Sequence, residues 1–454
     1  MLSCYTTEAN ALIPITILLP EQYRDWLKEQ SLSIQNWLNS LSYSGEPGSL
    51  ALLPSVEGQL QRVLISVKSR EDFWALADLS TRLPLGNYTI DGSAIDINSA
   101  AIAWGLNAYI FQRYKKSEKK IATLYLPKTC DAVSVDHFVN TIYWIRDLIN
   151  TPTENMGPEE LAKEAKNLAK QFKANFREIV GDDLLKQNYP AIHAVGRAST
   201  RAPRLVELRW GSSHARKVTL VGKGVCFDTG GLNIKLNSGM NLMKKDMGGA
   251  AHVLGLAKLI MAFQLPIQLR VLIPLVENSI SGNAYRPGDI IPTRKGISVE
   301  IGNTDAEGRV ILSDALTAAC EENPDLIIDF ATLTGAARVA LGTDLPALFC
   351  NQEKLATDLL TYSAKTQDPL WRMPLFAPYR ELIDSPLANI SNSGSSSYAG
   401  AITAALFLQD FINPDIPWAH LDLMAWNVRT RPGRPEGGEA MALRAVFEYL
   451  RLSS

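Results

Sequence analysis

The pattern of hydrophobic and polar positions divides the chain into two parts. Up to about residue 145, residues 61–67 and 121–127 alternate in the way that predicts strands. Residues 70–83 and 99–116 carry the wider apolar spacing that predicts helices. Residues 1–145 are therefore expected to form a small N-terminal α/β domain.

Helix-boundary signals mark the end of this first part. Asn150, Thr151 and Pro152 are expected to stop one helix, and Gly157-Pro158 places a proline at the first turn of the next. We place the domain boundary here, with a second domain over residues 146–454.

In the second part, short β-branched runs alternate with longer helical ones. The predicted strands are 217–222, 269–276 and 325–333, and the predicted helices are 246–263, 309–322 and 399–412. This alternation predicts an α/β fold with a mostly parallel sheet flanked by helices. Ligand sites in such sheets lie at the carboxyl ends of the strands.

The composition is typical of an ordinary globular protein. The 454 residues are 46% apolar and 20% charged, with a net charge of −2, so no nucleic-acid or membrane partner is required. The N-terminus lacks a basic region, and no run of about 18 apolar residues occurs, so a cytoplasmic location is expected. Five scattered cysteines indicate reduced thiols. The basic run 113–120 is interpreted as a solvated helix end.

Charged residues gather where predicted strands end or helices begin. They are Lys223, Asp228, Lys235, Asp246, Asp305, Glu307 and Arg309. Each has an ordinary explanation: Asp246 could be a helix N-cap, the lysines could be solvated, and Asp305 and Glu307 could be a polar strand edge. In an extended segment, however, those last two carboxylates would face one spot, which is costly unless a cation relieves it.

Taken together, the four carboxylates predict a metal centre. They carry a formal charge of −4, which two divalent cations would balance, and paired-metal hydrolases hold their ions about 3.5–4 Å apart between such groups. Oxygen-rich ligation without a histidine cluster leaves zinc possible and makes manganese, magnesium and cobalt plausible. His252, the nearest histidine, is interpreted as a packed helix residue.

Three motifs also resemble a known family. The segments VGKGVCFDTGGLNIK, MKKDMGGAAHV and NTDAEGRVILSDAL are similar to signatures of the leucine aminopeptidases, the cytosolic two-metal exopeptidases, and the resemblance extends over roughly residues 146–450. It implies that Asp228 and Glu307 bridge two metal ions. Lys223 and Asp246 would complete the tightly held site, and Asp305 the exchangeable one.

The same resemblance implies roles for the remaining charged residues. Lys235 would stabilise the tetrahedral intermediate formed when a metal-bridging hydroxide attacks the peptide, and Arg309 would hold a bicarbonate ion acting as general base. The metal ions would be zinc or manganese, with magnesium or cobalt possible at the exchangeable site. The residues expected to touch substrate are Met243, Asn303, Thr332, Leu333 and Gly335.

The resemblance also implies a substrate and an assembly. The expected substrates are short peptides with a free N-terminus and a leucine-like first residue, and the expected assembly is a homohexamer. Two alternatives remain open. One is a catalytically silent relative acting as a DNA-binding or scaffold protein, and the other is a sugar- or nucleotide-binding module built on the first domain.

Three departures from the family pattern are visible. Cys226 stands where relatives tend to carry a small hydroxyl residue, and we interpret it as a packing residue. Lys245 adds a charge where a small residue is usual. The turn from Gly437 to Ala442, which includes Glu439 and Met441, replaces the usual small-residue turn and leaves the side-chain preference undetermined.

Overall fold

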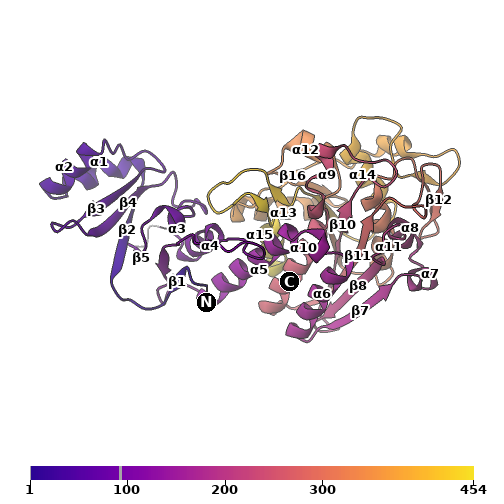
Figure 1. Cartoon of the computed structure of the whole chain (residues 1–454), viewed down its shortest axis with the longest axis horizontal. Coiled ribbons are helices and arrows are strands. Elements are labelled where there is room, and N and C mark those ends of the chain that lie inside the picture. The colour runs from indigo at the N-terminus through magenta and orange to yellow at the C-terminus, as the bar shows by residue number, and fades with distance from the viewer. Residues whose placement is uncertain (1, 92–94, 454) are drawn as a thin grey trace. The chain divides into compact units, whose positions relative to one another are not determined.

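The computed structural model describes residues 2–91 and 95–453, which form two compact units (Figure 1). Unit 1 comprises Met1–Tyr143 and Arg429–Glu436, and unit 2 comprises Trp144–Val428 and Gly437–Ser454. The division falls within one helix, α5 (Ala132–Asn150). The short segment Arg429–Glu436 thus belongs with unit 1 although it lies far along the chain, which the hydrophobic pattern did not indicate.

Unit 1 is built on a six-stranded sheet in the order β1-β6-β5-β2-β4-β3. The strands are β1 (Tyr5–Thr6), β2 (Leu12–Leu18), β3 (Leu50–Pro54), β4 (Leu60–Ser66), β5 (Asn87–Ile90) and β6 (Thr123–Tyr125), with helices α1 (Pro20–Lys28), α2 (Leu32–Ser40), α3 (Leu79–Arg82) and α4 (Ile97–Asn107). Every pairing except β3–β4 is parallel. Buried Leu18, Tyr23, Leu38 and Leu64 join α1 and α2 to the sheet.

Two predicted helices of unit 1 are wrong in extent. Within 70–83 only α3 is helical, because the Asp72 carboxylate accepts the N–H of Trp74 and turns the chain instead. Within 99–116 the helix ends at Asn107, and buried Tyr109 packs against the Tyr143 ring at 5.0 Å between centroids. The basic run 113–120 is therefore an exposed irregular segment rather than a helix end.

Unit 2 contains a nine-stranded sheet in the order β16-β15-β18-β14-β9-β11-β8-β7, with β10 paired to β11. The strands are β7 (Asn175–Val180), β8 (Arg204–Trp210), β9 (Arg216–Gly222), β10 (Gly224–Asp228), β11 (Ile267–Asn278), β14 (Leu326–Ala331), β15 (Ala347–Cys350), β16 (Trp371–Arg372) and β18 (Trp418–Asp422). The central strands β18, β14, β9 and β11 are parallel, and antiparallel pairings occur toward both edges. The expected α/β class with a mostly parallel central sheet is confirmed.

Helices cover both faces of this sheet. On one face α10 packs on β9, β11 and β14, and on the other α11 packs on β9 and β11 beside α8 and α14. The helices are α6 (Pro158–Phe172), α7 (Asp183–Lys186), α8 (Pro190–Gly196), α9 (Asn237–Met240), α10 (Gly248–Ala262), α11 (Glu307–Cys320), α12 (Gly335–Leu341), α13 (Glu353–Thr366), α14 (Gly400–Gln409) and α15 (Leu443–Leu452). None of the helices in the described part of the chain combines the length and the hydropathy needed to cross a bilayer.

Short elements complete unit 2. They are the 3₁₀ turns η1 (Thr153–Asn155), η2 (Met243–Lys245) and η3 (Ala377–Ile383), a small sheet of β12 (Ile290–Pro292), β13 (Ser298–Glu300) and β17 (Ile390–Ser391), and the pair β19 (Trp426–Asn427) and β20 (Gly437–Gly438). Since β13 pairs with β17, it brings the residues after Ser391 beside the chain that follows Glu300. This pairing matters for the site described below.

A polar pair lies in the centre of the sheet of unit 2. His420 Nδ1 is 2.6 Å from Asp329 Oδ1, and the indole N–H of Trp418 donates to the other carboxylate oxygen at 2.7 Å. All three side chains are fully buried. Burial lowers the pKa of His420, but the charge and hydrogen bond of Asp329, together with the charge of Asp422, raise it by more, so its pKa in the folded protein lies above the ordinary value.

This pair predicts a pH-dependent stability. Because the folded-state pKa of His420 is raised, its contribution is full below the unfolded value of about 6.5 and is lost as pH rises through the folded value. The nearby charges of Asp422 and Arg309 act in opposite directions on this pKa. We expect the stability difference between wild type and His420→Gln to shrink as pH rises from 5.5 to 9, measured by urea unfolding.

Exposed His214 supplies the control, since His214→Gln removes a histidine that has no carboxylate partner among the described residues. A wild-type advantage over His420→Gln that stays constant across this pH range would contradict the ion-pair assignment.

Candidate active site

A cavity of about 560 Å³ opens at the carboxyl ends of the central strands of unit 2. Its lining includes every residue that the sequence singled out for the site: Lys223, Asp228, Lys235, Met243, Asp246, Asn303, Asp305, Glu307, Arg309, Thr332, Leu333 and Gly335. Residues that are up to 112 positions apart in the chain thus share one cavity, from Lys223 to Gly335. The structure brings all of them together, while the role of each remains a prediction.

Strand ends deliver the first of these side chains. Lys223 directly follows β9, Asp228 is the last residue of β10, and Thr332 directly follows β14. Because β9 and β14 run parallel, and β10 runs parallel to β11 in the same sheet, their carboxyl ends reach one edge. The location of the cavity follows from the topology of the sheet.

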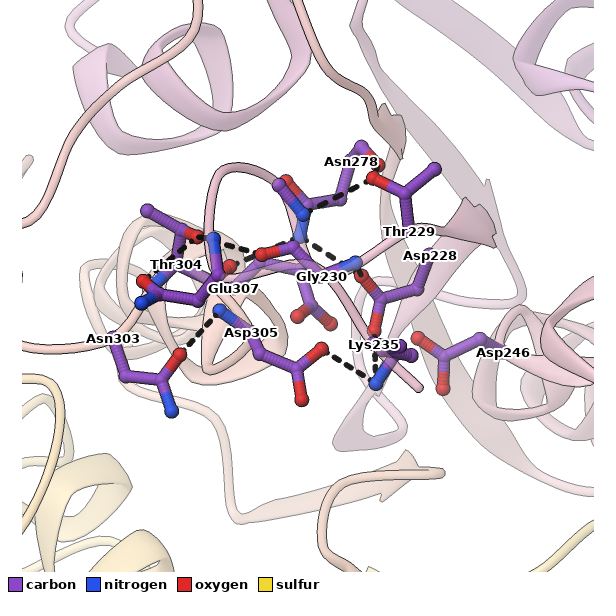
Figure 2. A network of polar contacts seen from close by, with 12 residues as sticks. Asp228, Thr229, Gly230, Lys235, Asp246, Asn278, Asn303, Thr304, Asp305 and Glu307 are labelled. Carbon is purple, nitrogen blue, oxygen red and sulfur yellow. Dashed lines mark hydrogen bonds and ion pairs between the residues drawn. The ribbon is translucent and has the colours of Figure 1, made fainter. Parts of the chain in front are cut away.

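One lysine joins two of the carboxylates directly (Figure 2). Lys235 Nζ lies 2.8 Å from Asp228 Oδ2 and 2.6 Å from Asp305 Oδ1. The other oxygen of Asp228 accepts the N–H of Gly230 and the side-chain amide of Asn278, each at 2.8 Å. Asp228 is thus held on both oxygens, whereas the Asp305 side chain keeps 32% of its surface exposed.

A second lysine joins the other two carboxylates. Lys223 Nζ lies 2.8 Å from Asp246 Oδ2 and 2.9 Å from Glu307 Oε1, and it donates to the carbonyl of Thr332 at 3.0 Å. Lys223, Asp246 and Glu307 are each at most 3% exposed. The site therefore contains two positions at which a positively charged nitrogen sits between a pair of carboxylates.

The N-cap interpretation of Asp246 is wrong. Helix α10 begins at Gly248, and Asp246 instead ends the 3₁₀ turn η2. Its Oδ1 accepts a hydrogen bond from the hydroxyl of Thr332 at 2.7 Å. The carboxylate is therefore directed into the site rather than at the backbone of α10.

The extended geometry expected around Asp305 is also wrong. Residues 302–306 form a turn, and Glu307 is the first residue of α11. The Asp305 N–H donates to the side chain of Asn303 at 2.8 Å, which tightens the turn. The turn still directs both carboxylates into the cavity, as the alternate spacing in the sequence suggested.

The electrostatics of the cluster favour additional positive charge. Burial raises the pKa of Glu307 to about 8, and the charge of Asp228 adds to the shift. Burial also raises the pKa of Asp228 to about 6. For Lys223 burial lowers the pKa, but Asp246 and Glu307 together raise it above its ordinary value. All of these shifts favour the proton-bound form, because four carboxylates face two lysines.

These residues fit a divalent metal centre. Oxygens of Asp228, Asp305 and Glu307 lie within 4.8 Å of one another. The Oε2 atom of Glu307 is buried and has no hydrogen-bond partner within residues 2–91 and 95–453. A buried carboxylate oxygen without a partner is costly, and a cation between these groups would relieve that cost.

A network of neutral side chains holds the ligand-bearing loops, and no motif in the sequence predicted this network. The Thr304 hydroxyl donates to the Gly230 carbonyl at 2.6 Å, while its carbonyl accepts from Asn278 at 2.9 Å and from Tyr285 at 2.6 Å. These bonds fix the loop that carries Asp305 to the loop that follows Asp228 (Figure 2).

Asn392 plays the same part from a more distant segment. Its side chain accepts the N–H groups of Gly302 and Asn303 and donates to the Asn303 carbonyl at 2.7 Å. Its own carbonyl accepts from Arg309 at 2.8 Å. The pairing of β13 with β17 brings Asn392 here, and no spacing rule in the sequence indicates that pairing. The following residues Ser393, Gly394, Ser396, Gly400 and Thr403 also line the cavity.

The residues that depart from the family pattern lie in three different environments. Cys226 is fully buried and is not among the residues that line the cavity, in keeping with a packing residue. Glu439 is bound by Arg146 and Asn427, so its charge is neutralised inside unit 2. Lys245 does line the cavity, and burial lowers its pKa to about 7.

His252 is the packed helix residue that was expected. Its ring is fully buried and stacks on Phe330, and its Nε2 accepts the N–H of Met441 at 2.8 Å. Burial lowers the pKa of His252 to about 4, so the ring is neutral at pH 7.

The fold and this cluster define a two-domain α/β protein with a carboxylate–lysine centre suited to divalent metal ions. Residues 143–447 match the model of the catalytic domain of the cytosol aminopeptidase family. Residues 13–127 match the model of the N-terminal domain of M17 aminopeptidases. The chain belongs to the cytosol aminopeptidase family.

Individual relatives agree with this assignment. A probable cytosol aminopeptidase of Chlamydia abortus is 40% identical over 359 residues, which are 75% of this chain and 72% of the relative. The crystal structure of the cytosol aminopeptidase from Coxiella burnetii superposes with a TM-score of 0.96 at 52% identity, covering 99% of each chain. The bottromycin maturation enzyme BotP in complex with Mn superposes with a TM-score of 0.87 at 30% identity, covering 98% of this chain and 99% of BotP.

Close approach of α11 to Lys223 gives a test of the site geometry. A Cβ atom at Gly308 would lie 2.6 Å from Lys223 Cε and 2.8 Å from Lys223 Nζ, so the flexible lysine has to move while the helix stays in place. We expect Gly308→Ala to retain its thermal stability, since alanine favours a helix, but to bind Mn²⁺ at least about tenfold more weakly by calorimetry.

The matched control is Gly282→Ala, where an added Cβ meets no atom within 4 Å. Equal Mn²⁺ affinity of the Gly308→Ala variant and wild type would show that the position of Lys223 does not matter for metal binding.

Proposed function

We propose that this protein is a metal-dependent aminopeptidase that removes a leucine-like N-terminal residue from short peptides. The observation that carries the proposal is the convergence of four carboxylates and two lysines in one cavity, with a buried oxygen of Glu307 lacking a partner among the described residues. Membership of the cytosol aminopeptidase family supports the reaction class. The comparisons give no support to the DNA-binding alternative.

The proposed metal ligands are Lys223 and the four carboxylates that surround the two lysine ammonium groups. Asp228 and Glu307 would be shared by two ions, with Lys223 and Asp246 at one and Asp305 at the other. When bound, the ions would polarise the scissile carbonyl and lower the pKa of a water molecule toward neutrality. The exposure of Asp305 supports its assignment to the more exchangeable site, with zinc or manganese as the first candidates and magnesium or cobalt as further ones.

Lys235 is the proposed electrophilic residue. Its ammonium group is fixed by two carboxylates and lines the cavity. Burial lowers its pKa, but the charges of Asp228 and Glu307 and the hydrogen bonds to Asp228 and Asp305 together raise it above the ordinary value. A lysine that stays protonated can donate to the oxygen on which negative charge develops during attack on the peptide. Releasing Asp228 and Asp305 to the metal ions would free this ammonium group for the substrate.

Arg309 is the proposed anion-binding residue. It is buried, lies in the first turn of α11, and one of its N–H groups is fixed by the Asn392 carbonyl. Burial lowers its pKa to about 10, which leaves the guanidinium charged at pH 7. In this position Arg309 would hold bicarbonate, which supplies a general base when bound.

Substrate selection would follow from the groups around the metal ligands. Met243 and Thr332 are the proposed walls of the first side-chain pocket, and Asn303, Leu333 and Gly335 the proposed contacts along the peptide, since all five line the cavity. A free α-amine near Asp246 would distinguish a chain terminus from an internal peptide bond. The resemblance further supports a homohexamer in the cytoplasm as the working form, which the solution mass of the protein would test.

The metal dependence can be tested with L-leucyl-p-nitroanilide. We expect no release of nitroaniline after chelation, recovery with Mn²⁺, Zn²⁺, Co²⁺ or Mg²⁺ to different extents, and a loss of at least about a hundredfold in Glu307→Gln, since altering even an outer-shell partner of a ligand costs 10- to 100-fold. Rates are measured at saturating concentrations of each ion.

The matched control is Glu353→Gln, which alters an exposed glutamate that pairs with Arg372. Release of nitroaniline that persists without any divalent ion, or in the Glu307→Gln variant, would contradict the proposed function.

A further inference from the structure

One wall of the active-site cavity carries positive charge that the proposed chemistry does not use. Lys245 and Arg338 both line the cavity, alongside the carboxylate cluster. Neither is a proposed metal ligand, and neither is among the groups proposed to act on the reacting peptide bond. Their presence calls for a separate explanation.

Lys245 is a buried lysine without a carboxylate partner. The residue is 1% exposed, and its ammonium nitrogen makes no hydrogen bond or ion pair among the residues described. By contrast, Lys223 and Lys235 each lie within 3 Å of two carboxylates. Burying an unpaired lysine costs free energy, so a group that supplies the missing partner would bind here with a net gain.

Arg338 repeats this situation on α12. Its Nη1 atom is buried and finds no hydrogen-bond partner in the described part of the chain. The acidic side chain of Asp422 is already used, since it accepts the N–H groups of Leu333 and Thr334 and the hydroxyl of Thr334. A guanidinium group and an amine whose pKa burial lowers to about 7 thus face one cavity, and neither forms an ion pair with a carboxylate of the described chain.

We propose that Lys245 and Arg338 form a subsite for a carboxylate group of the substrate. This inference rests on the proposed aminopeptidase function and specifies which peptides the site prefers. A carboxylate suits the pair because it accepts several charge-assisted hydrogen bonds at once, and a planar guanidinium matches it well.

Two carboxylates of a short peptide can reach such a subsite. One is the side chain of an N-terminal aspartate or glutamate, and the other is the C-terminal carboxylate of a dipeptide. A C-terminal carboxylate is compatible with a leucine-like first residue, whereas an acidic first side chain would take the place of that residue. The experiment below separates the two sources.

The test compares pairs of substrates that differ only in a carboxylate. L-glutamyl-p-nitroanilide against its L-glutaminyl counterpart probes the side chain, and L-leucyl-glycine against L-leucyl-glycine amide probes the C-terminus. We expect wild type to prefer the acidic member of at least one pair by about tenfold or more in kcat/KM. Arg338→Gln and Lys245→Met are each expected to reduce that preference about tenfold.

Lys244→Met is the matched control. It removes a lysine one position away, whose ammonium group is bound to the Asn150 carbonyl and which is not among the cavity-lining residues, and it should leave the ratio unchanged. Calorimetric binding of glutamate and glutamine provides a readout without turnover, in which glutamate should bind more tightly to wild type but not to Arg338→Gln.

The outcomes separate this inference from the function on which it rests. Turnover of L-leucyl-p-nitroanilide with acid-to-amide ratios near one in both pairs would overturn the subsite and leave the aminopeptidase intact. A preference for the acidic member that survives in both Arg338→Gln and Lys245→Met would also overturn it. Absence of turnover with every substrate and ion would instead remove the proposed function.

Discussion

Repulsion among four carboxylates at one edge of a sheet is the constraint on which the site of this protein depends. Asp228, Asp246 and Glu307 are buried, and like charges at such distances cannot all be ionised unless cations lie between them. Two lysines supply half of the compensating charge, and burial together with the charge of Asp228 raises the pKa of Glu307 to about 8. A divalent metal centre is the arrangement that balances the whole set.

The fold keeps these charged side chains close together despite their mutual repulsion. Parallel strands bring their carboxyl ends together, and neutral side chains then fix the loops that follow. Thr304 and Asn392 direct their hydrogen bonds to backbone groups of the ligand-bearing loops, and Asn278 donates both to the Thr304 carbonyl and to one oxygen of Asp228. The carboxylates are thus positioned by bonds that remain in place when cations exchange, which is the usual way in which outer partners tune a metal site.

The sequence predicted the charged centre better than its surroundings. Asp228, Asp246 and Glu307 could be predicted because each lies at the end of a strand or close to the start of a helix, where α/β topology places ligand sites. Asn392 could not, because its role depends on the pairing of β13 with β17, a contact between segments about 90 residues apart. Arg338 carries no motif either, since only the absence of a partner for Nη1 in the described chain distinguishes it from a surface arginine.

The helical spacing of hydrophobic residues predicted a helix wrongly where a side chain formed a hydrogen bond with the backbone instead. Residues 70–83 have helical spacing, but the Asp72 carboxylate binds the N–H of Trp74, and such local bonds compete with a helix. Asp246 shows the same ambiguity: its type and place also allowed a helix cap, while its oxygens bind Thr332 and Lys223 instead. Short polar side chains are ambiguous in sequence because the same oxygen can serve a helix end or a site.

The cavity contains both negatively and positively charged side chains, and both can act on a bound peptide. A short peptide carries an amine at one end and a carboxylate at the other, and the lining of the cavity includes both the carboxylate cluster and the cationic side chains of Lys245 and Arg338. The amine would favour the cluster in which four carboxylates face two lysines, and a carboxylate would favour Lys245 and Arg338. The cavity has a volume of about 560 Å³, which is within the usual range for a small-ligand pocket. Charge complementarity within one chain would then select small peptides.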